Sequence, residues 1–474
     1  MSKGIRITNV RIGKEIFPIS NEKIFNQEKN FYTVIIGNNA SGKSRFLVNI
    51  LNVFRQSLNQ RLKSTNENVH IECFINGKKE LITNDSFIVK DINEINLLTI
   101  SNSLFDKFPH EVKTDKNYAY IGVRVKGINI HKRAIINDLM DVFNENLKDQ
   151  SFIIKAKQLF DFLKIEPIIQ IKLRNTFNTS LNRSDIIKYS KSVESLQLFL
   201  RDLSRQSFFR QQAKIIEKYS EDIDFLEGFI NFINSNSDIL VRSPKNKLHY
   251  HLEINLNKSN DKNKTFLTEY RYITLLRRLN FLTYDSIILQ KGNIEFDIQD
   301  SSTGEIGMLM TFLRAIPELK PNSLIFIDEP EISLHPSWQL KYIDLLKKFL
   351  EGYSGCHVLI ATHSHFILSD LKENFSSVVV LNNNNGKFSA ELKKYTPFGW
   401  SPEAILYDVF GVINVRNHYF EYDLRQMLSL ISKRSKDYKK INYYLRKFSQ
   451  FNLTDGDPLH EIIKEAENYV KNKE

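Results

Sequence analysis

Eight residues near the N-terminus have types and spacing suited to binding phosphate. The pattern G-x-x-x-x-G-K-[ST] is matched in full by Gly37, Asn38, Asn39, Ala40, Ser41, Gly42, Lys43 and Ser44. Glycines let successive backbone N–H groups point at one anion. Lys43 can neutralise the β/γ-phosphates, and the Ser44 hydroxyl can bind Mg²⁺. The apolar run 31–36 precedes the loop and helical spacing over 44–62 follows it, so a helix N-terminus would face the same anion. A chance Gly/Lys loop rarely has both neighbours.

A second group of acids completes this chemistry. The apolar run 324–327 predicts a buried strand that ends at Asp328 and Glu329. Asp328 can hold Mg²⁺ through water. Glu329 can orient and deprotonate an attacking water. A charged strand end explains the pair alone, but agreement with the phosphate loop favours an ATP site.

Several segments resemble the ABC-type AAA ATPases. That group includes SMC-like and DNA-repair ATPases, the overcoming-lysogenization-defect nucleases and stand-alone bacterial defence ATPases. Residues 328–336, DEPEISLHP, closely resemble its D-E-P-E-x-x-L-H-P stretch. Residues 301–305 resemble the ABC signature, 333–336 the D-loop and 361–364 the switch-histidine segment. The resemblance covers roughly residues 1–126 and 285–395.

The resemblance implies a mechanism in which two subunits enclose two ATP molecules. Ser302 and Gly304 would then touch the γ-phosphate held by the other subunit. His363 would hydrogen-bond the γ-phosphate and help hold the water near Glu329. It therefore implies Glu329, His363 and Lys43 as catalytic residues, ATP and Mg²⁺ as ligands, and a homodimer or higher homo-oligomer formed through ATP.

The order of elements predicts an α/β P-loop NTPase of the ABC-ATPase type. Its mixed, partly parallel sheet is interrupted by a mainly helical insertion. We expect an ATPase lobe with the Walker A loop at 1–126, the insertion at 127–284, a second ATPase lobe at 285–395 and a helical C-terminal region at 396–474. Helical spacing is expected over 133–147, 152–163, 184–203 and 213–233, and strands over 286–290 and 293–298.

Some positions that the family pattern requires are not assigned. We find no glutamine after the strand expected at 118–125, and Gln150 and Gln158 are weak candidates. Phe17 is the candidate for stacking on adenine. Asp455-Gly456-Asp457 mimics a nuclease metal pair, but a turn at Gly456 is the better interpretation, and no intrinsic nuclease domain is evident.

Composition sets wider limits. The sequence has only two cysteines, which excludes a disulfide framework and a zinc hook. It has no apolar run of about 18 residues, the length that a membrane helix needs, so we expect a cytoplasmic protein without membrane contact. The net charge of +11 allows nucleic-acid binding, although lysine-rich compositions also arise without it. The basic, tyrosine-containing stretch 433–447 is either a phosphate-tracking face or a solvated helix with its tyrosines in the core.

Three functions fit these features. The first is the regulatory ATPase of a bacterial antiphage defence complex, resembling the ATPase of Septu-type systems, which controls a separate effector such as a nuclease. The second is a DNA-repair or chromosome-maintenance ATPase that binds DNA directly. The third is a nucleotide-gated scaffold in which slow hydrolysis times assembly.

Overall fold

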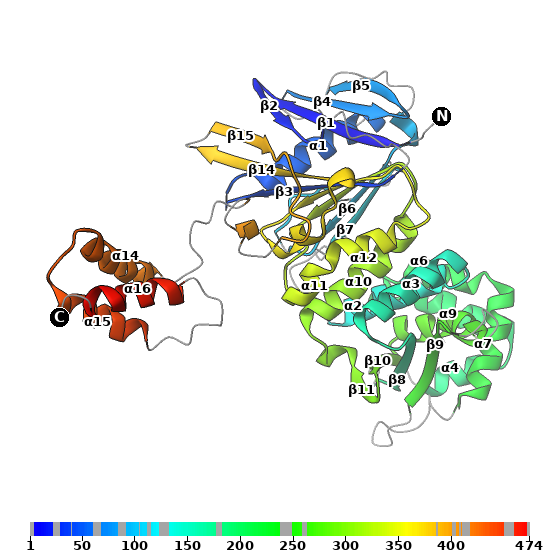
Figure 1. Ribbon diagram of the computed structural model, residues 1–474. Coiled ribbons are helices and arrows are strands. Elements are labelled where there is room, and N and C mark those ends of the chain that lie inside the picture. Colours follow the sequence, from blue (N-terminus) through cyan, green and yellow to red (C-terminus); the bar gives the residue numbers. More distant parts are fainter. Residues whose placement is uncertain are drawn as a thin grey trace. The chain divides into compact units, whose positions relative to one another are not determined.

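The computed structural model forms two compact units, Met1–Trp400 and Ser401–Glu474. The residues that it describes are 4–21, 29–38, 40–59, 68–83, 92–103, 105–110, 115–122, 132–176, 183–237, 249–257, 263–384, 387–400, 404–406, 409, 418–449 and 459–471. None of the helices in these ranges is long and apolar enough to cross a membrane. Figure 1 shows the elements of both units.

A seven-stranded sheet organises the larger unit. Its strands, in spatial order, are β15 (Lys387–Leu392), β14 (Ser376–Asn384), β3 (Phe31–Gly37), β13 (His357–Ala361), β12 (Ser323–Asp328), β6 (Asn96–Ser101) and β7 (Tyr118–Gly122). All neighbours run parallel except β14 and β15, which form an antiparallel hairpin. The short apolar runs at β12 and β13 are buried at every residue, as expected for strands covered on both faces. The prediction of a mixed, partly parallel sheet is confirmed.

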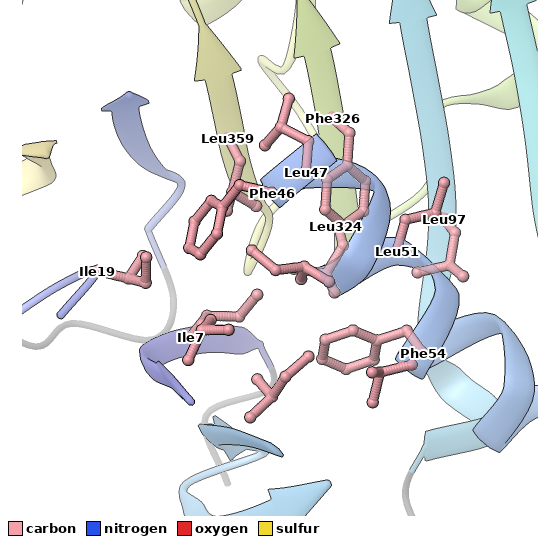
Figure 2. Close-up of a cluster of buried hydrophobic side chains, with 14 of the residues drawn as sticks. Ile7, Ile19, Phe46, Leu47, Leu51, Phe54, Leu97, Leu324, Phe326 and Leu359 are labelled. Carbon is pink, nitrogen blue, oxygen red and sulfur yellow. The ribbon is translucent and has the colours of Figure 1, made fainter. Parts of the chain in front are cut away.

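The helix α1 (Lys43–Leu58) lies between this sheet and a second, antiparallel one (Figure 1). The second sheet has the order β2 (Glu15–Pro18), β1 (Ile5–Ile12), β4 (Val69–Ile75) and β5 (Lys78–Thr83). Figure 2 shows Leu47, Leu51 and Phe54 of α1 packed with Leu324 and Phe326 of the large sheet. The start of α1, directly after the phosphate loop, is therefore fixed by a buried core.

The other face of the large sheet carries α10 (Thr303–Ala315) and α12 (Tyr342–Phe349), preceded by the short α11 (Pro336–Leu340). Phe312 of α10 packs edge-on against Phe349 of α12, with ring centroids 4.6 Å apart. Single 3₁₀ turns complete the connections: η1 (Ile92–Glu94), η2 (Ser207–Phe209), η4 (Ile298–Asp300), η5 (Ile316–Glu318), η6 (Phe366–Asp370) and η7 (Glu373–Phe375).

The insertion contains both helices and a sheet. Its helices are α2 (Lys132–Asn146), α3 (Gln150–Leu163), α4 (Arg183–Tyr189), α5 (Val193–Arg205), α6 (Ala213–Ser220), α7 (Ile223–Ser235) and α9 (Lys264–Arg278). Its antiparallel sheet has the order β11 (Ile294–Asp297), β10 (Leu282–Lys291), β8 (Ile168–Asn175) and β9 (His249–Asn255). The Lys155 ammonium on α3 donates to the carbonyl oxygens of Phe349 and Glu351, which anchors the insertion to the end of α12.

Three details of the sequence-based expectation are corrected. The strands expected over 286–290 and 293–298 belong to the sheet of the insertion, so the expected boundary at 285 falls inside β10. The helix expected over 184–203 is two helices, because Ser192 caps the N-terminus of α5. The helix expected over 213–233 is likewise divided where Asp222 caps α7.

The described part of the smaller unit includes the helices α14 (His418–Ser432), α15 (Tyr438–Phe448) and α16 (Leu459–Lys471). These helices share a core of their own, formed by Met427, Ile441, Tyr444, Leu445, Phe448, Ala466 and Val470. The residues 455–457 that mimic a nuclease metal pair lie outside the described residues.

A buried ion pair joins α1 to the start of β7. The Arg55 guanidinium lies 2.7 Å from the Asp115 carboxylate and stacks on the Tyr118 ring at 4.2 Å, with both charged side chains almost fully buried. We expect Asp115→Ala to lower the free energy of unfolding by about 3–5 kcal/mol, because it leaves a buried charge unpaired. Urea denaturation measures the change. The control is Asp344→Ala, which breaks a half-exposed pair with Lys348 and should cost at most about 1 kcal/mol. Equal losses would contradict the prediction.

Candidate nucleotide-binding site

Three loops meet at one edge of the large sheet. They follow β3, β13 and β12, which are parallel neighbours, and parallel strands present their carboxyl ends at the same edge. Ala361 of β13 is paired with both Asp328 of β12 and Ile35 of β3. The phosphate loop, the acidic pair and the switch-histidine segment are therefore side by side, although they lie far apart in the sequence.

The phosphate loop has the backbone that its sequence predicts. Ala40 and Gly42 have positive φ angles of 62° and 86°, the left-handed region in which glycine is least strained. A Cβ on Gly37 would lie 2.4 Å from the carbonyl oxygen of Leu381 on β14, so only glycine fits there. Within the described residues, the buried Ser41 hydroxyl has no hydrogen-bond partner. Asn38 accepts from the backbone N–H of Ser41, and Asn39 lies outside the described residues.

Lys43 lies at the centre of this edge. Its ammonium donates to the carbonyl oxygen of Gly37 at 3.0 Å and to Nε2 of His363 at 2.8 Å. Burial, followed by the charge of Lys43, lowers the pKa of His363, so the imidazole is neutral and its Nε2 accepts. Burial also lowers the pKa of Lys43, against the opposing charges of Glu331, Glu329 and Asp328. A phosphate would compete with His363 for the same ammonium.

Ser44 and Asp328 form the candidate Mg²⁺ site. The Ser44 hydroxyl donates to Oδ1 of Asp328 at 3.0 Å. Burial raises the pKa of Asp328 to about 7, against the hydrogen bond from Ser44. A hydroxyl and a buried carboxylate are oxygen ligands of the kind Mg²⁺ prefers. Ser44 and Asp328 therefore fit the Mg²⁺ ion that would accompany a bound ATP.

Two further acids shape the same edge. Glu329 has a positive φ of 49°, and its N–H donates to the carbonyl oxygen of Ala361, which ties it to β13. Glu331 accepts from the backbone N–H of His363 at 2.6 Å and from the Thr362 hydroxyl at 2.8 Å. Glu331 therefore holds the switch segment in place, a role that our sequence analysis did not assign.

Ser302 and Gly304 lie elsewhere, against the D-loop. The exposed Ser302 caps α10 by accepting from the N–H of Glu305. A Cβ on Gly304 would lie 2.1 Å from the carbonyl oxygen of Ser333, so this glycine is required by a contact inside the chain. Within the described residues, no hydrogen bond joins either residue to the phosphate loop. The close approach that the resemblance assigned to a γ-phosphate thus already has a cause within one subunit.

A cavity of about 310 Å³ adjoins the phosphate loop. Its lining includes Gly42 and Arg45 from the loop and α1, and Phe388 from β15. The sequence-based candidate Phe17 also lines it, but the Phe17 ring is 4% exposed and packs on Phe46 at 5.2 Å. Phe388 is 40% exposed and lies next to Gly42, which makes it the better candidate for stacking on a nucleobase.

The loop that follows β6 lies beside the acidic pair. β6, rather than β7, is the neighbour of β12, and Ser101 of β6 is paired with Asp328. The loop after β6 contains Asp106, whose charge further raises the pKa of Asp328. Gln150 and Gln158 lie on α3, in the insertion. Strand order depends on pairing between distant residues, so local patterns did not indicate this neighbour.

The AAA ATPase domain family matches residues 1–368, and the chain belongs to this family. Among individual proteins, the chain is similar to the Retron Vc95 probable ATPase of Vibrio cholerae serotype O1 biovar El Tor. The two are 21% identical over 437 residues, which cover 83% of this chain and 77% of that protein.

Two other similarities are with a Septu protein, over a shorter segment, and with a solved structure, at lower identity. The Septu protein PtuA of Bacillus thuringiensis is 25% identical over 143 residues, covering 30% of this chain and 35% of PtuA. Among solved structures, the SMC head domain from Thermotoga maritima matches with 11% identity and a TM-score of 0.29, over 82% of this chain and 99% of that one.

We expect Phe388→Ala to weaken ATP binding by about fivefold to a hundredfold, because base–aromatic stacking contributes about 1–3 kcal/mol. Calorimetric titration with ATP and with tripolyphosphate measures this, and tripolyphosphate affinity should not change. Phe208→Ala, which removes a similarly exposed ring from the insertion, is the control. If both ligands lost affinity equally, Phe388 would act by packing on Gly42 and not by stacking.

We expect Asp328→Asn to stabilise the nucleotide-free protein at pH 8. The pKa of Asp328 is about 7 in the folded protein against its ordinary value of 3.8, so the folded state binds this proton more tightly. The resulting stability is present below about pH 4 and is lost as the pH rises through 7. Asparagine avoids the loss, which is on the order of 1–4 kcal/mol.

Thermal unfolding from pH 4 to pH 8 without nucleotide or Mg²⁺ tests this expectation. The Tm difference between Asp328→Asn and the parent should be near zero at pH 4 and positive at pH 8. The exposed Asp161→Asn on α3 is the control and should show no such trend. A difference independent of pH would show that burial of the ionised Asp328 is not its cause.

Proposed function

We propose that this protein binds and hydrolyses ATP with Mg²⁺ and regulates a separate effector protein in a bacterial antiphage defence complex. The observation that carries the ATPase part is the convergence of Lys43, Ser44, Asp328 and His363 through two direct hydrogen bonds at one sheet edge. Glu329 begins the turn that follows Asp328. Ser44 donates to Asp328, whereas no hydroxyl of the described residues donates to the Glu329 side chain. We assign it as the base that deprotonates the attacking water.

The proposed chemistry divides among these residues. The phosphate loop and Lys43 bind the phosphates, and Ser44 and Asp328 would hold Mg²⁺, which neutralises developing charge on the phosphates. His363, held by Glu331 through its backbone, hydrogen-bonds the γ-phosphate after leaving Lys43. Glu329 takes the proton of the water.

We infer that the active assembly contains at least two copies of the chain. Ser302 is exposed at the N-terminus of α10, and its signature segment does not reach the phosphate loop of its own chain. A helix N-terminus attracts phosphate. Association of two chains would place this terminus on the ATP of the partner, so that ATP stabilises the dimer and hydrolysis loosens it.

The defence role rests on the relatives named after a retron and after Septu. A nuclease is the expected effector, because we find no nuclease motif in the sequence. The main alternative is a DNA-repair or maintenance ATPase that binds DNA directly, favoured by the net charge of +11. A scaffold with slow hydrolysis would show turnover independent of partner and nucleic acid.

We expect Glu329→Gln to retain ATP binding, lose turnover by at least about a hundredfold and accumulate as an ATP-bound dimer, because the base is removed while the binding residues remain. Light scattering after gel filtration measures the mass, and phosphate release measures turnover. Co-purification from the native host with ATP identifies the partner. A nuclease at fixed stoichiometry supports the regulatory role, and nucleic acid alone supports the maintenance role.

Two variants in the Glu329→Gln background separate binding from association. Lys43→Ala should abolish ATP binding and leave a monomer. Ser302→Arg should leave ATP bound to a monomer, because it blocks only the surface offered to the partner. Ser192→Arg removes a comparable helix cap from the insertion and should still dimerise. A dimer in Ser302→Arg would exclude the proposed arrangement.

A further inference from the structure

The C-terminal unit carries a concentrated cluster of cations. It lies at the junction of α14 and α15 and comprises Lys433, Arg434, Lys436, Lys439 and Lys440. All five side chains are exposed, and none forms an ion pair with another described residue. The one acid among them, Asp437, caps α15 by accepting from the N–H of Lys440. The cluster is therefore a concentrated, solvated positive charge.

The two helices that flank this cluster, α14 and α15, each carry one tyrosine with an exposed ring. Tyr443 of α15 is 60% exposed and follows Lys439 and Lys440 by one helical turn, so the three share a helix face. Lys447, the next residue on that face, reaches Asp423 of α14. Tyr422, adjacent to Asp423, is 57% exposed.

The neighbouring Tyr444 is buried instead: its side chain is 6% exposed and belongs to the core of the unit. Of the two interpretations left open for the stretch 433–447, the one with tyrosines in the core holds for Tyr444, and the exposed Tyr443 leaves the phosphate-tracking face open. The Tyr443 ring meets this core only at its edge, with its centroid 5.4 Å from that of Tyr444, and its exposed side remains available to a ligand.

We propose that this basic-aromatic face, formed by the five cations with Tyr422 and Tyr443, binds single-stranded nucleic acid. Lysine and arginine neutralise backbone phosphates and release their counterions. Exposed aromatic rings stack on unpaired bases of any sequence. A duplex hides its bases, and an acidic peptide has none, so neither would use the tyrosines. This inference does not rest on the nucleotide site, and it holds whether or not the protein regulates an effector.

Fluorescence anisotropy with the full chain tests the proposal, using labelled 20-nucleotide single strands of DNA and RNA and a DNA duplex over a range of salt. The triple variant K436Q/K439Q/K440Q should lower the salt slope, log K against log [salt], by about 2, because each lost phosphate contact on a single strand removes about 0.7. Tyr443→Ala should weaken single-strand binding by about fivefold or more at an unchanged slope. Tyr443→Phe should bind as the parent does.

The control is K464Q/K471Q, which removes two exposed lysines from α16 of the same unit and should leave binding unchanged. ATP turnover without nucleic acid should be equal in all these variants, which separates a failure here from a failure of the ATPase proposal. Comparing the DNA and RNA single strands shows which nucleic acid is preferred, and binding of either one to the basic-aromatic face supports the proposal. An unchanged slope in the triple variant, a duplex bound as tightly as the single strand, or equal competition by polyglutamate would overturn it.

Discussion

The site depends on one constraint, the parallel alignment of β3, β13 and β12. Each strand ends in a loop with different chemistry, and pairing of Ala361 with Ile35 and with Asp328 brings the three ends level. A slip of one residue at β12 would turn Asp328 to the opposite face of the sheet and remove its hydrogen bond with Ser44. Burial of both faces of these strands fixes the register, so the apolar core shown in Figure 2 is what sets the geometry of the polar edge.

The carboxyl edge of the large sheet gathers buried acidic side chains, whose negative charges a bound cation would neutralise. Asp328 and Glu331 both have raised pKa values because burial disfavours their ionised forms, and the Lys43 ammonium interacts electrostatically with both. Lys43 also holds His363, whose segment is held in turn by Glu331. In the proposed mechanism, a phosphate bound to Lys43 would therefore change the hydrogen bonding of the switch segment directly. This single ammonium group would couple ligand binding to the position of His363.

Local patterns in the sequence predicted the parts of this protein that local interactions determine. The phosphate loop, the strand before Asp328 and the helix after Ser44 were recognisable because a turn, an apolar run and helical spacing each lie within a short window. Features that depend on distant pairing were not. β6 as the neighbour of β12, β10 as a partner of β8, and Phe388 against Gly42 all join segments far apart in the chain. The divided helices are an intermediate case, because the caps Ser192 and Asp222 were visible in the sequence but weaker than the apolar spacing around them.

The contact between Gly304 and Ser333 links the two halves of the proposed mechanism inside one chain. Ser333, with a positive φ of 62°, ends a tight turn that begins at Glu329, in which the N–H of Ile332 donates back to Glu329. The signature helix packs so closely on that turn that a single methyl group would not fit. A shift of the turn on loss of the γ-phosphate must therefore move the N-terminus of α10, since close-packed groups cannot absorb it locally. In a dimer whose α10 termini contact the ATP of the partner, hydrolysis at one site would be felt at the other through this contact.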